Sequence, residues 1–248
     1  MRIVLGWRNS KLEHMSITRA PIAQKLPTER HVHGDVHTDN YEWFREKENP
    51  ALIAHLEAEN AWTRERTEHL DELQEHLVSE IAALTRQTDT TVPWREGDWW
   101  YYQRTWEGKQ YPAVFRLPAH GGERPNLGDL REEQCVWDGN VLADGEEFFS
   151  TSGFAPSPNG RLGVLGVDHS GDEHFRLRVF DIEMGYVVDE VVGGVSYGMV
   201  WTADSGKIAY ARVDDSWRSW QIWLHTVGTH SSEDSLLFQE DDDRFDVW

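Results

Sequence analysis

The sequence predicts a mainly β protein with a helical hairpin near its N-terminus, and its β part is predicted to be an incomplete β-propeller of about three blades. Two observations lead to this fold class. Helix-like periodicity stops near Thr85 and gives way to short strand-like runs separated by turn residues. Those runs recur with a period of about 45 residues, which is typical of propeller blades. We therefore divide the chain into a disordered leader, residues 1–14, an arm with the helical hairpin, residues 15–88, and a partial propeller, residues 89–248.

The helical part is predicted to begin at Asn49, because Asn is a preferred N-cap and Pro50 suits the first position of a helix. Apolar residues spaced three or four apart then predict two helices, each with one apolar side. The first helix would bury Leu52, Ile53, Leu56 and Trp62, and the second carries Leu70, Leu73, Leu77, Ile81 and Leu84. We expect the two helices to fold back on one another as a hairpin that ends near Thr85.

Strands are predicted from runs rich in β-branched and aromatic residues that end at Gly, Pro, Asn or Asp. The run Trp99–Tyr102 is aromatic at successive positions, which suits a strand buried on both faces between neighbouring sheets. Six runs qualify: Trp99–Arg104, Tyr111–Leu117, Leu162–Asp168, Phe175–Asp181, Lys207–Val213 and Gln221–Thr226.

The β part also repeats. SPNGRLGVLGVD aligns with ADSGKIAYARVD, which matches Leu162 with Ile208 and Asp168 with Asp214. RLRVFDI aligns with QIWLHTV further along, and GDWWYYQRT followed by QYPAVFRL is a degenerate earlier copy. Several strands per repeat indicate propeller blades. The alternative interpretation is a pair of unrelated hairpins in a β-sandwich.

The repeats are too few to close a ring. About 160 residues follow the helices, enough for three to four blades of about 45 residues, whereas closed propellers have about four to eight. A terminal blade then lacks the neighbour that would cover its apolar face. We expect the chain, which ends at Trp248, to be either a fragment of a longer protein or one member of a complex with a partner chain.

Composition excludes several functions. The net charge of -20 argues against nucleic acid and anionic membranes as partners, because phosphate binding needs clustered Lys and Arg. An acidic surface suits a cationic substrate, although it commonly serves solubility alone. The single Cys135 and the lack of any long apolar segment predict a cytoplasmic protein. Neither a Walker loop nor a GxGxxG motif is present, so we expect no cofactor.

Residues 31–39, HVHGDVHTD, are dense in possible metal ligands. His31 and His33 would share one side of a strand and could join His37 or Asp39 in a ligand set. The segment has no helix-based ligand spacing such as HExxH, and its Gly-Asp pair reads as a turn. We therefore interpret it as a packing segment and expect no metal site.

The pattern GVSYG matches GxSxG, the nucleophile elbow, and would make Ser196 a nucleophile. The elbow requires a strand, a sharp turn and then a helix. The residues after Ser196 instead run into the next predicted strand, and glycines are expected where strands of adjacent blades connect. We therefore assign no catalytic residue.

Several segments of the chain carry specific combinations of residues. The arm has an aspartate, an aromatic residue, a tryptophan and a later Glu-Asn pair: Asp39, Tyr41, Trp43, Glu59 and Asn60. Further motifs are HGD at residues 33–35, the aromatic and EGKQYP segment at 99–112, SPNGR at 157–161 and SGD at 170–172. The pattern in the arm resembles the prolyl oligopeptidase family of serine peptidases, and the further motifs resemble the oligopeptidase B (protease II) group within it. The resemblance runs from about Pro21 to the end of the chain.

The resemblance implies a seven-bladed propeller between a helical arm and a C-terminal α/β-hydrolase domain, and cleavage of short peptides after Lys or Arg. The catalytic serine, aspartate and histidine of the family lie in that domain, and no residue of this sequence matches them. We expect a non-catalytic propeller lid and arm in which Trp43 and Phe44 are packing anchors, inactive without the hydrolase domain. The alternatives are a scaffold module that binds a partner chain and a GxSxG hydrolase that uses Ser196.

Overall fold

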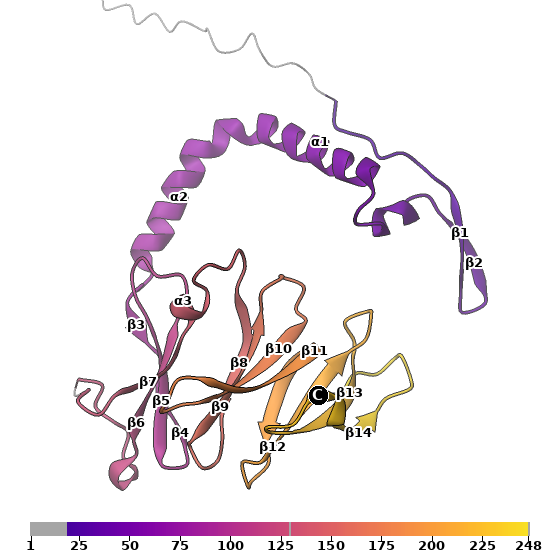
Figure 1. Ribbon diagram of the computed structural model, residues 1–248. Helices are drawn as coiled ribbons and strands as arrows, with labels where there is room; N and C mark the ends of the chain where they lie inside the picture. The colour runs from indigo at the N-terminus through magenta and orange to yellow at the C-terminus, as the bar shows by residue number, and fades with distance from the viewer. Residues whose placement is uncertain (1–18, 129, 248) are drawn as a thin grey trace, which may run out of the picture. The chain divides into compact units, whose positions relative to one another are not determined.

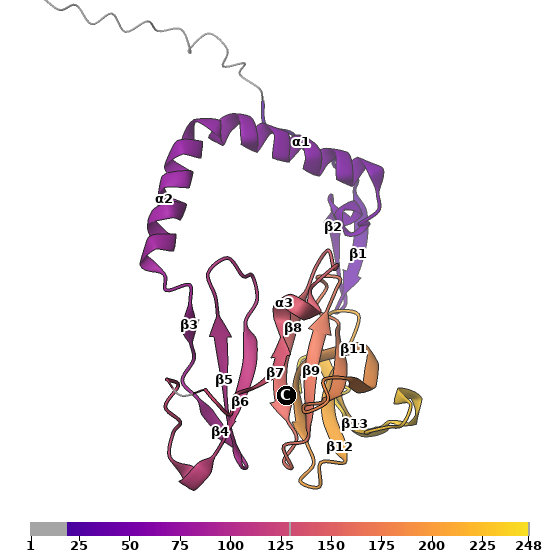
Figure 2. The same ribbon diagram turned by 60° about the vertical axis from the view of Figure 1, so that its left-hand side comes forward.

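The computed structural model describes residues 19–128 and 130–247, so the predicted leader, residues 1–14, lies outside the described part. The chain divides into two compact units, of which the first ends at Thr85 and the second begins at Arg86. The first unit holds the two long helices and a β-hairpin, and the second holds the remaining strands with the short helical turns between them (Figures 1 and 2).

The first unit begins with a hairpin and continues into helices. Its elements are β1 (Thr28–Val32), β2 (Asp35–Asp39), η1 (Glu42–Arg45), α1 (Pro50–Thr67), η2 (Glu68–Leu70) and α2 (Asp71–Leu84). The predicted start of the first helix is confirmed, because the Asn49 side chain accepts a hydrogen bond of 2.9 Å from Ala51 N and Pro50 opens the helix.

The predicted helical hairpin is wrong. α1 continues into α2 through the short turn η2, so the helices follow one another and do not pack side by side (Figure 1). Between Trp62 and Leu70 the sequence holds neither Gly nor Pro, so no residue there stops the helix. Leu52 is the buried member of the predicted inner sides, whereas these members are exposed: Ile53, Leu56, Leu70, Leu73, Leu77, Ile81 and Leu84.

Trp43 fixes η1 within the first unit. Its side chain is buried, and its Nε1 donates a hydrogen bond of 3.0 Å to the Gln24 carbonyl oxygen. The Phe44 ring meets the Trp43 ring edge-on at 4.5 Å and lies 5.6 Å from the His55 ring of α1. Both aromatic residues therefore pack, although Phe44 also remains partly open to solvent.

The second unit consists of two antiparallel sheets. One has the order β3-β5-β6-β7, with β4 also paired to β5, and contains β3 (Asp89–Thr90), β4 (Trp94–Glu96), β5 (Trp99–Thr105), β6 (Ala113–Pro118) and β7 (Gln134–Asp138). The other runs in sequence order from β8 to β14 and contains β8 (Ser150–Pro156), β9 (Leu162–Asp168), β10 (Phe175–Asp181), β11 (Val187–Trp201), β12 (Lys207–Val213), β13 (Ser219–Thr226) and β14 (Ser235–Gln239). Short helical turns lie between strands: η3 (His120–Gly122), α3 (Gly139–Leu142) and η4 (Ser231–Glu233).

Strand β11 shows that the seven-stranded sheet consists of two blades. Its first part pairs with β10 up to Val195, and its last part, ending at Trp201, pairs with β12. Gly193 and Gly194 lie at the change of partner with φ of 114° and 61°, a conformation that residues with a side chain disfavour. The same strand is therefore the outer strand of the second blade, β8–β11, and the inner strand of the third, β11–β14.

The first sheet is the first blade. Its inner strand is divided into β3 and β4, which both pair with β5, through Thr90 opposite Arg104 and Trp94 opposite Tyr101. The second unit thus holds three blades. The fold class predicted from the sequence, an incomplete propeller of about three blades, is confirmed.

Two apolar layers lie between the blades. The layer between the first and second blades includes Tyr101, Val114, Trp137, Leu165, Val167 and Phe180. The layer between the second and third includes Val164, Leu177, Val179, Trp201, Ile208 and Tyr210. Successive residues Tyr101 and Tyr102 are both fully buried, so the predicted two-sided burial of their strand is confirmed.

The predicted alignment of the repeats matches the second blade with the third correctly, but one of its residue matches is shifted by one position. Leu162 pairs with Asp181 in the second blade, and Lys207 pairs with Thr226 in the third. Leu162 therefore corresponds to Lys207 and not to Ile208, as the sequence alignment predicted. A bulge between Arg212 and Val213 supplies the extra residue further along.

Asp168 closes the turn that follows β9. Its carboxylate accepts hydrogen bonds from the backbone nitrogens of Ser170, Gly171 and Glu173, at 2.7, 3.0 and 3.0 Å. Burial raises the pKa of this carboxyl, but the hydrogen bonds lower the pKa by more than burial raises it. The pKa therefore lies below its ordinary value. The charged form is the one that the turn requires.

We expect Asp168→Asn to lower the free energy of unfolding by about 1–3 kcal/mol at pH 7, because turn amides lose a charged acceptor. Since the folded-state pKa is depressed, the wild-type advantage is present above about pH 4 and is lost as the pH falls through the folded-state pKa. Urea unfolding between pH 7 and pH 2 measures both effects. The control is Asp215→Asn, which replaces an exposed carboxylate in the corresponding turn after β12. A loss that did not depend on pH would contradict this role.

Candidate functional site

Ser196, the residue of the GxSxG pattern, lies inside β11 with its side chain buried. Its Oγ is 2.7 Å from the Oγ of Ser219 on β13. After Ser196 the chain continues as a strand to Trp201, whereas a nucleophile elbow needs an exposed hydroxyl on a turn into a helix. The segment around Ser196 therefore does not have the geometry of a nucleophile elbow, and the glycines of the pattern lie where β11 passes from one blade to the next.

The histidine-rich segment forms the β1–β2 hairpin. His33 and Gly34 make its turn with φ of 52° and 88°, so His33 does not share a strand face with His31. His37 lies opposite Arg30, and Arg30 forms an ion pair of 3.4 Å with Glu42. Within residues 19–128 and 130–247, no three His, Cys, Asp or Glu side chains are grouped to hold a metal ion.

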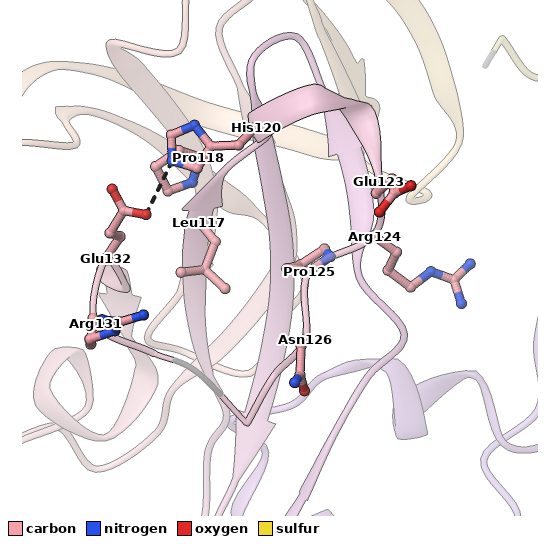
Figure 3. A pocket seen from close by; sticks show the side chains of 9 residues that line it. All are labelled: Leu117, Pro118, His120, Glu123, Arg124, Pro125, Asn126, Arg131 and Glu132. Atoms are coloured by element: carbon pink, nitrogen blue, oxygen red, sulfur yellow. Dashed lines mark hydrogen bonds and ion pairs between the residues drawn. The ribbon is translucent and has the colours of Figure 1, made fainter.

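A hollow of about 520 Å³ opens between the end of β6 and the segment that leads to β7 (Figure 3). At its rim, His120 Nε2 lies 3.1 Å from Glu132 Oε2, and both side chains are mostly exposed. The lining residues include no hydroxyl or thiol: Leu117, Pro118, His120, Glu123, Arg124, Pro125, Asn126, Arg131 and Glu132. The hollow thus offers no nucleophile for acyl transfer.

One side of α2, which we call the α2 apolar face, is formed by Leu73, Leu77 and Ile81. These residues are spaced four apart and therefore lie on the same side of the helix. Their exposed fractions are 52%, 46% and 63%, although burial of such side chains is favourable by roughly 25 cal/mol per Å². A contiguous exposed apolar side of this kind indicates a contact surface. Among the described residues, no helix has the length and hydrophobicity to cross a membrane.

Strand β14 forms a second surface, which we call the β14 edge. It pairs with β13 alone, and its sequence SLLFQ holds neither a charge nor a proline. Leu236, Leu237 and Phe238 are all exposed. Edge strands normally carry charges, prolines or bulges that prevent further pairing, so an unprotected apolar edge indicates a surface that another element covers.

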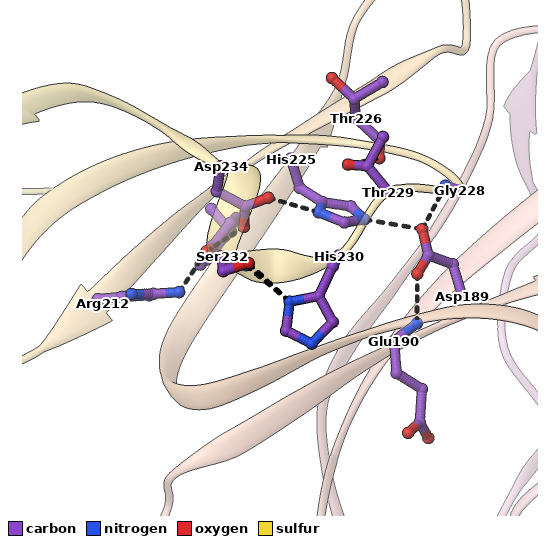
Figure 4. A network of polar contacts seen from close by, with 11 residues as sticks. Asp189, Glu190, Arg212, His225, Thr226, Gly228, Thr229, His230, Ser232 and Asp234 are labelled. Atoms are coloured by element: carbon purple, nitrogen blue, oxygen red, sulfur yellow. Dashed lines mark hydrogen bonds and ion pairs between the residues drawn. The ribbon is translucent and has the colours of Figure 1, made fainter.

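A buried polar cluster, the His225 cluster, joins the second blade to the third (Figure 4). His225 on β13 is fully buried, and its Nδ1 lies 2.7 Å from Asp234 Oδ1 while its Nε2 lies 2.8 Å from Asp189 Oδ2 on β11. The Tyr210 hydroxyl donates to Asp234 Oδ2 at 2.7 Å, and Arg212 donates to the Tyr210 oxygen at 2.9 Å. Burial and the Asp234 carboxylate raise the pKa of Tyr210, which stays a donor.

The first blade carries a related arrangement. The Tyr102 hydroxyl donates to Glu133, and Arg104 Nη2 lies 2.6 Å from Glu133 Oε1. The Arg104 guanidinium also lies 4.6 Å from the centre of the Phe115 ring, which is opposite Tyr102 in the neighbouring strand.

The third blade repeats this arrangement at corresponding positions: Tyr210, Arg212, Trp223 and Asp234. The Arg212 guanidinium lies 4.6 Å from the Trp223 ring centre, matching the distance in the first blade. Neither cluster was predicted from the sequence, although the recurrence of Tyr-x-Arg in YYQR and AYAR was a usable signal. No local pattern could have joined Asp189 to His225, because they belong to different blades.

The structure therefore defines the class: the chain holds consecutive blades of a propeller, with exposed surfaces at the α2 apolar face and the β14 edge. Residues 21–247 match the model of the prolyl oligopeptidase N-terminal beta-propeller domain. The chain belongs to the prolyl oligopeptidase family.

Comparison with known proteins agrees. The chain is 31% identical over 240 residues to dipeptidyl aminopeptidase BI of Pseudoxanthomonas mexicana, covering 93% of this chain and 33% of that protein. It is 31% identical over 233 residues to protease 2 of Moraxella lacunata, covering 93% and 33%. The structure of oligopeptidase B from Leishmania major superposes with a TM-score of 0.83 at 26% identity, covering 93% of this chain and 34% of that one. The chain thus spans about a third of the length of these relatives.

We expect Ser196→Ala and Ser219→Ala each to lower the free energy of unfolding by about 1 kcal/mol, because each leaves the other buried hydroxyl without its partner. The double variant should lose less than the sum of the single losses, as for two residues that contact one another. Urea unfolding of the three variants tests this. An activated-ester hydrolysis by the purified chain that Ser196→Ala alone abolished would contradict the structural role.

Proposed function

We propose that this chain forms the arm and first blades of a serine peptidase of the oligopeptidase B kind, which cleaves short peptides after Lys or Arg. The chain contributes substrate selection by size and domain packing, and the bond is broken elsewhere in the enzyme. The observation that carries the proposal is the pair of exposed apolar surfaces, the α2 apolar face and the β14 edge, on a chain of this family.

The chemistry of such an enzyme is acyl transfer through a serine ester, with a histidine base and an oxyanion hole. In the described residues the candidate serine, Ser196, is buried against Ser219 and has no histidine beside it. The catalytic groups are thus proposed to lie in an α/β-hydrolase domain that packs on the chain. The α2 apolar face offers a surface for that domain, and the β14 edge offers one for a further blade.

Specificity for Lys or Arg is drawn from the resemblance to oligopeptidase B. The net charge of -20 supports it, because an acidic chain attracts cationic peptides. One relative is named a dipeptidyl aminopeptidase and another a protease, so relatives of similar identity differ in the activity that they are named for.

Cys135 is a free, exposed thiol, which fits the reducing compartment that we propose, the cytoplasm.

A second candidate function is favoured by the same β14 edge. An unprotected edge strand can pair with a strand of a separate polypeptide, which would make the chain a scaffold module with a partner. Sedimentation tests the exposed edge on which both functions depend, since a stable, compact monomer would count against both a partner chain and a fragment with an uncovered blade.

The purified chain is expected to show no hydrolysis of reporter peptides ending in Lys or Arg, because the serine of its GxSxG pattern, Ser196, is buried against Ser219 and is not placed beside a base. A fluorogenic reporter assay measures this, with a reporter for dipeptide release as the comparison. Turnover that a serine-directed phosphonate removed would contradict the proposal.

The α2 apolar face supplies a further prediction. In an enzyme that joins this segment to a hydrolase domain, Leu77→Glu with Ile81→Glu should lower the melting temperature and the peptidase activity, because charges would enter the contact. In the chain alone the same change should alter the free energy of unfolding by no more than about 0.5 kcal/mol, since both side chains are exposed. Glu75→Lys on the opposite side of α2 is the matched control. Equal effects in both proteins would contradict the assignment of this face.

A further inference from the structure

The His225 cluster poses a question of proton placement. Both ring nitrogens of His225 face carboxylate oxygens, at 2.7 Å and 2.8 Å. A carboxylate only accepts hydrogen bonds, whereas a neutral imidazole has one N–H and one lone pair. Two N–H donors exist only in the imidazolium form, so the geometry fits a histidine that is charged inside the protein.

The two aspartates are placed as acceptors. Asp189 Oδ2 also receives the Gly228 backbone N–H at 2.5 Å, and its Oδ1 receives the Glu190 N–H at 2.8 Å. Asp234 Oδ2 receives the Tyr210 hydroxyl at 2.7 Å. Because hydrogen-bond donors already face these oxygens, both carboxyl groups act as acceptors in their ionised form. The proton between each carboxylate and the ring therefore belongs to an imidazole nitrogen.

Charge balance leads to the same assignment. The side chains of His225 and Asp234 have no exposed surface, and that of Asp189 is 11% exposed. With Arg212 and a charged His225, the cluster holds two positive and two negative groups, whereas a neutral His225 leaves a buried excess of negative charge. Figure 4 shows the neighbouring titratable groups outside this set: His230 faces Ser232, and Glu190 extends away from the imidazole.

We propose that the His225 imidazolium is a clasp between blades, tying the outer strand of the second blade to the third, and that this seam loosens when alkaline pH removes its proton. Asp189 belongs to the part of β11 that pairs with β10, and His225 belongs to β13, so the bond crosses from blade to blade. Loss of the proton turns one of the two N–H donors into a lone pair that faces a carboxylate. The inference rests on this contact and not on the proposed peptidase activity.

The direction of the pH effect follows from the same contacts. Burial lowers the pKa of His225, but the hydrogen bonds to Asp189 and Asp234 raise it more, so it lies above the ordinary value of 6.5. A raised folded-state pKa means that the stabilisation is complete below about pH 6.5 and is lost as the pH rises through the folded-state value.

The protonation state can be observed directly in the full chain. Nitrogen-15 spectra of the histidine rings, recorded from pH 6 to pH 9, should show both nitrogens of His225 protonated at neutral pH. Asp189→Asn removes the carboxylate of the other blade and keeps Asp234, so it should shift proton release from His225 to lower pH. A single protonated nitrogen in the wild type at pH 7, or an unchanged release in Asp189→Asn, would overturn the clasp.

Thermal unfolding tests the seam. His225→Gln should lower the melting temperature by roughly 5–15 °C at pH 6.5, because a buried charge network loses its centre. The difference should shrink as the pH is raised toward 9, when the wild type loses the same interaction. His230→Gln, which removes an exposed imidazole from the same region, is the control and should change the melting temperature by less than about 2 °C. A difference between His225→Gln and wild type that stays constant with pH would refute the proposal.

Discussion

Contact between neighbouring blades is the constraint on which the rest of this fold depends. A four-stranded antiparallel sheet has two faces, and the second blade buries both of them, with Leu165 toward the first blade and Val164 toward the third. The first and third blades each have one neighbouring blade in the described chain, so each has a sheet face that no described blade covers, and the exposed apolar side chains of β14 lie in the last of these blades. In stacked repeats, stability comes from such adjacent pairs, so uncovered surfaces concentrate at the ends of the stack.

Polar groups add specificity to this apolar stack. The first and third blades place a tyrosine, an arginine and an acid at corresponding positions, so neither arginine is buried without partners. In the third blade the set is extended by His225 to Asp189 of the preceding blade. A buried charge network of this kind gains less than its contacts suggest, because its members lose their hydration, but breaking it is costly because a charge is then left buried without its partner.

The sequence predicted the strands best where an apolar run ends at a turn residue. The bounds of β9, β10 and β12 agree with the predicted runs because Asp or Gly closes each of them. Strand β11 was missed because Gly193 and Gly194 were interpreted as a connection between blades, and β7 and β8 were not among the six predicted runs. The prediction of a helical hairpin was wrong because periodicity shows which side of a helix is apolar, but not which element covers that side. His225 could not be found, since its partners lie in distant segments.

The sharing of β11 has a consequence for how such proteins change over time. Because one continuous strand serves both the second and the third blade, no cut between these two blades leaves both intact. A duplicated or transplanted third blade must therefore begin in mid-strand, near Gly193 and Gly194. The first and second blades are instead joined by the segment between β7 and β8, so an engineered graft can begin at that segment without dividing a strand.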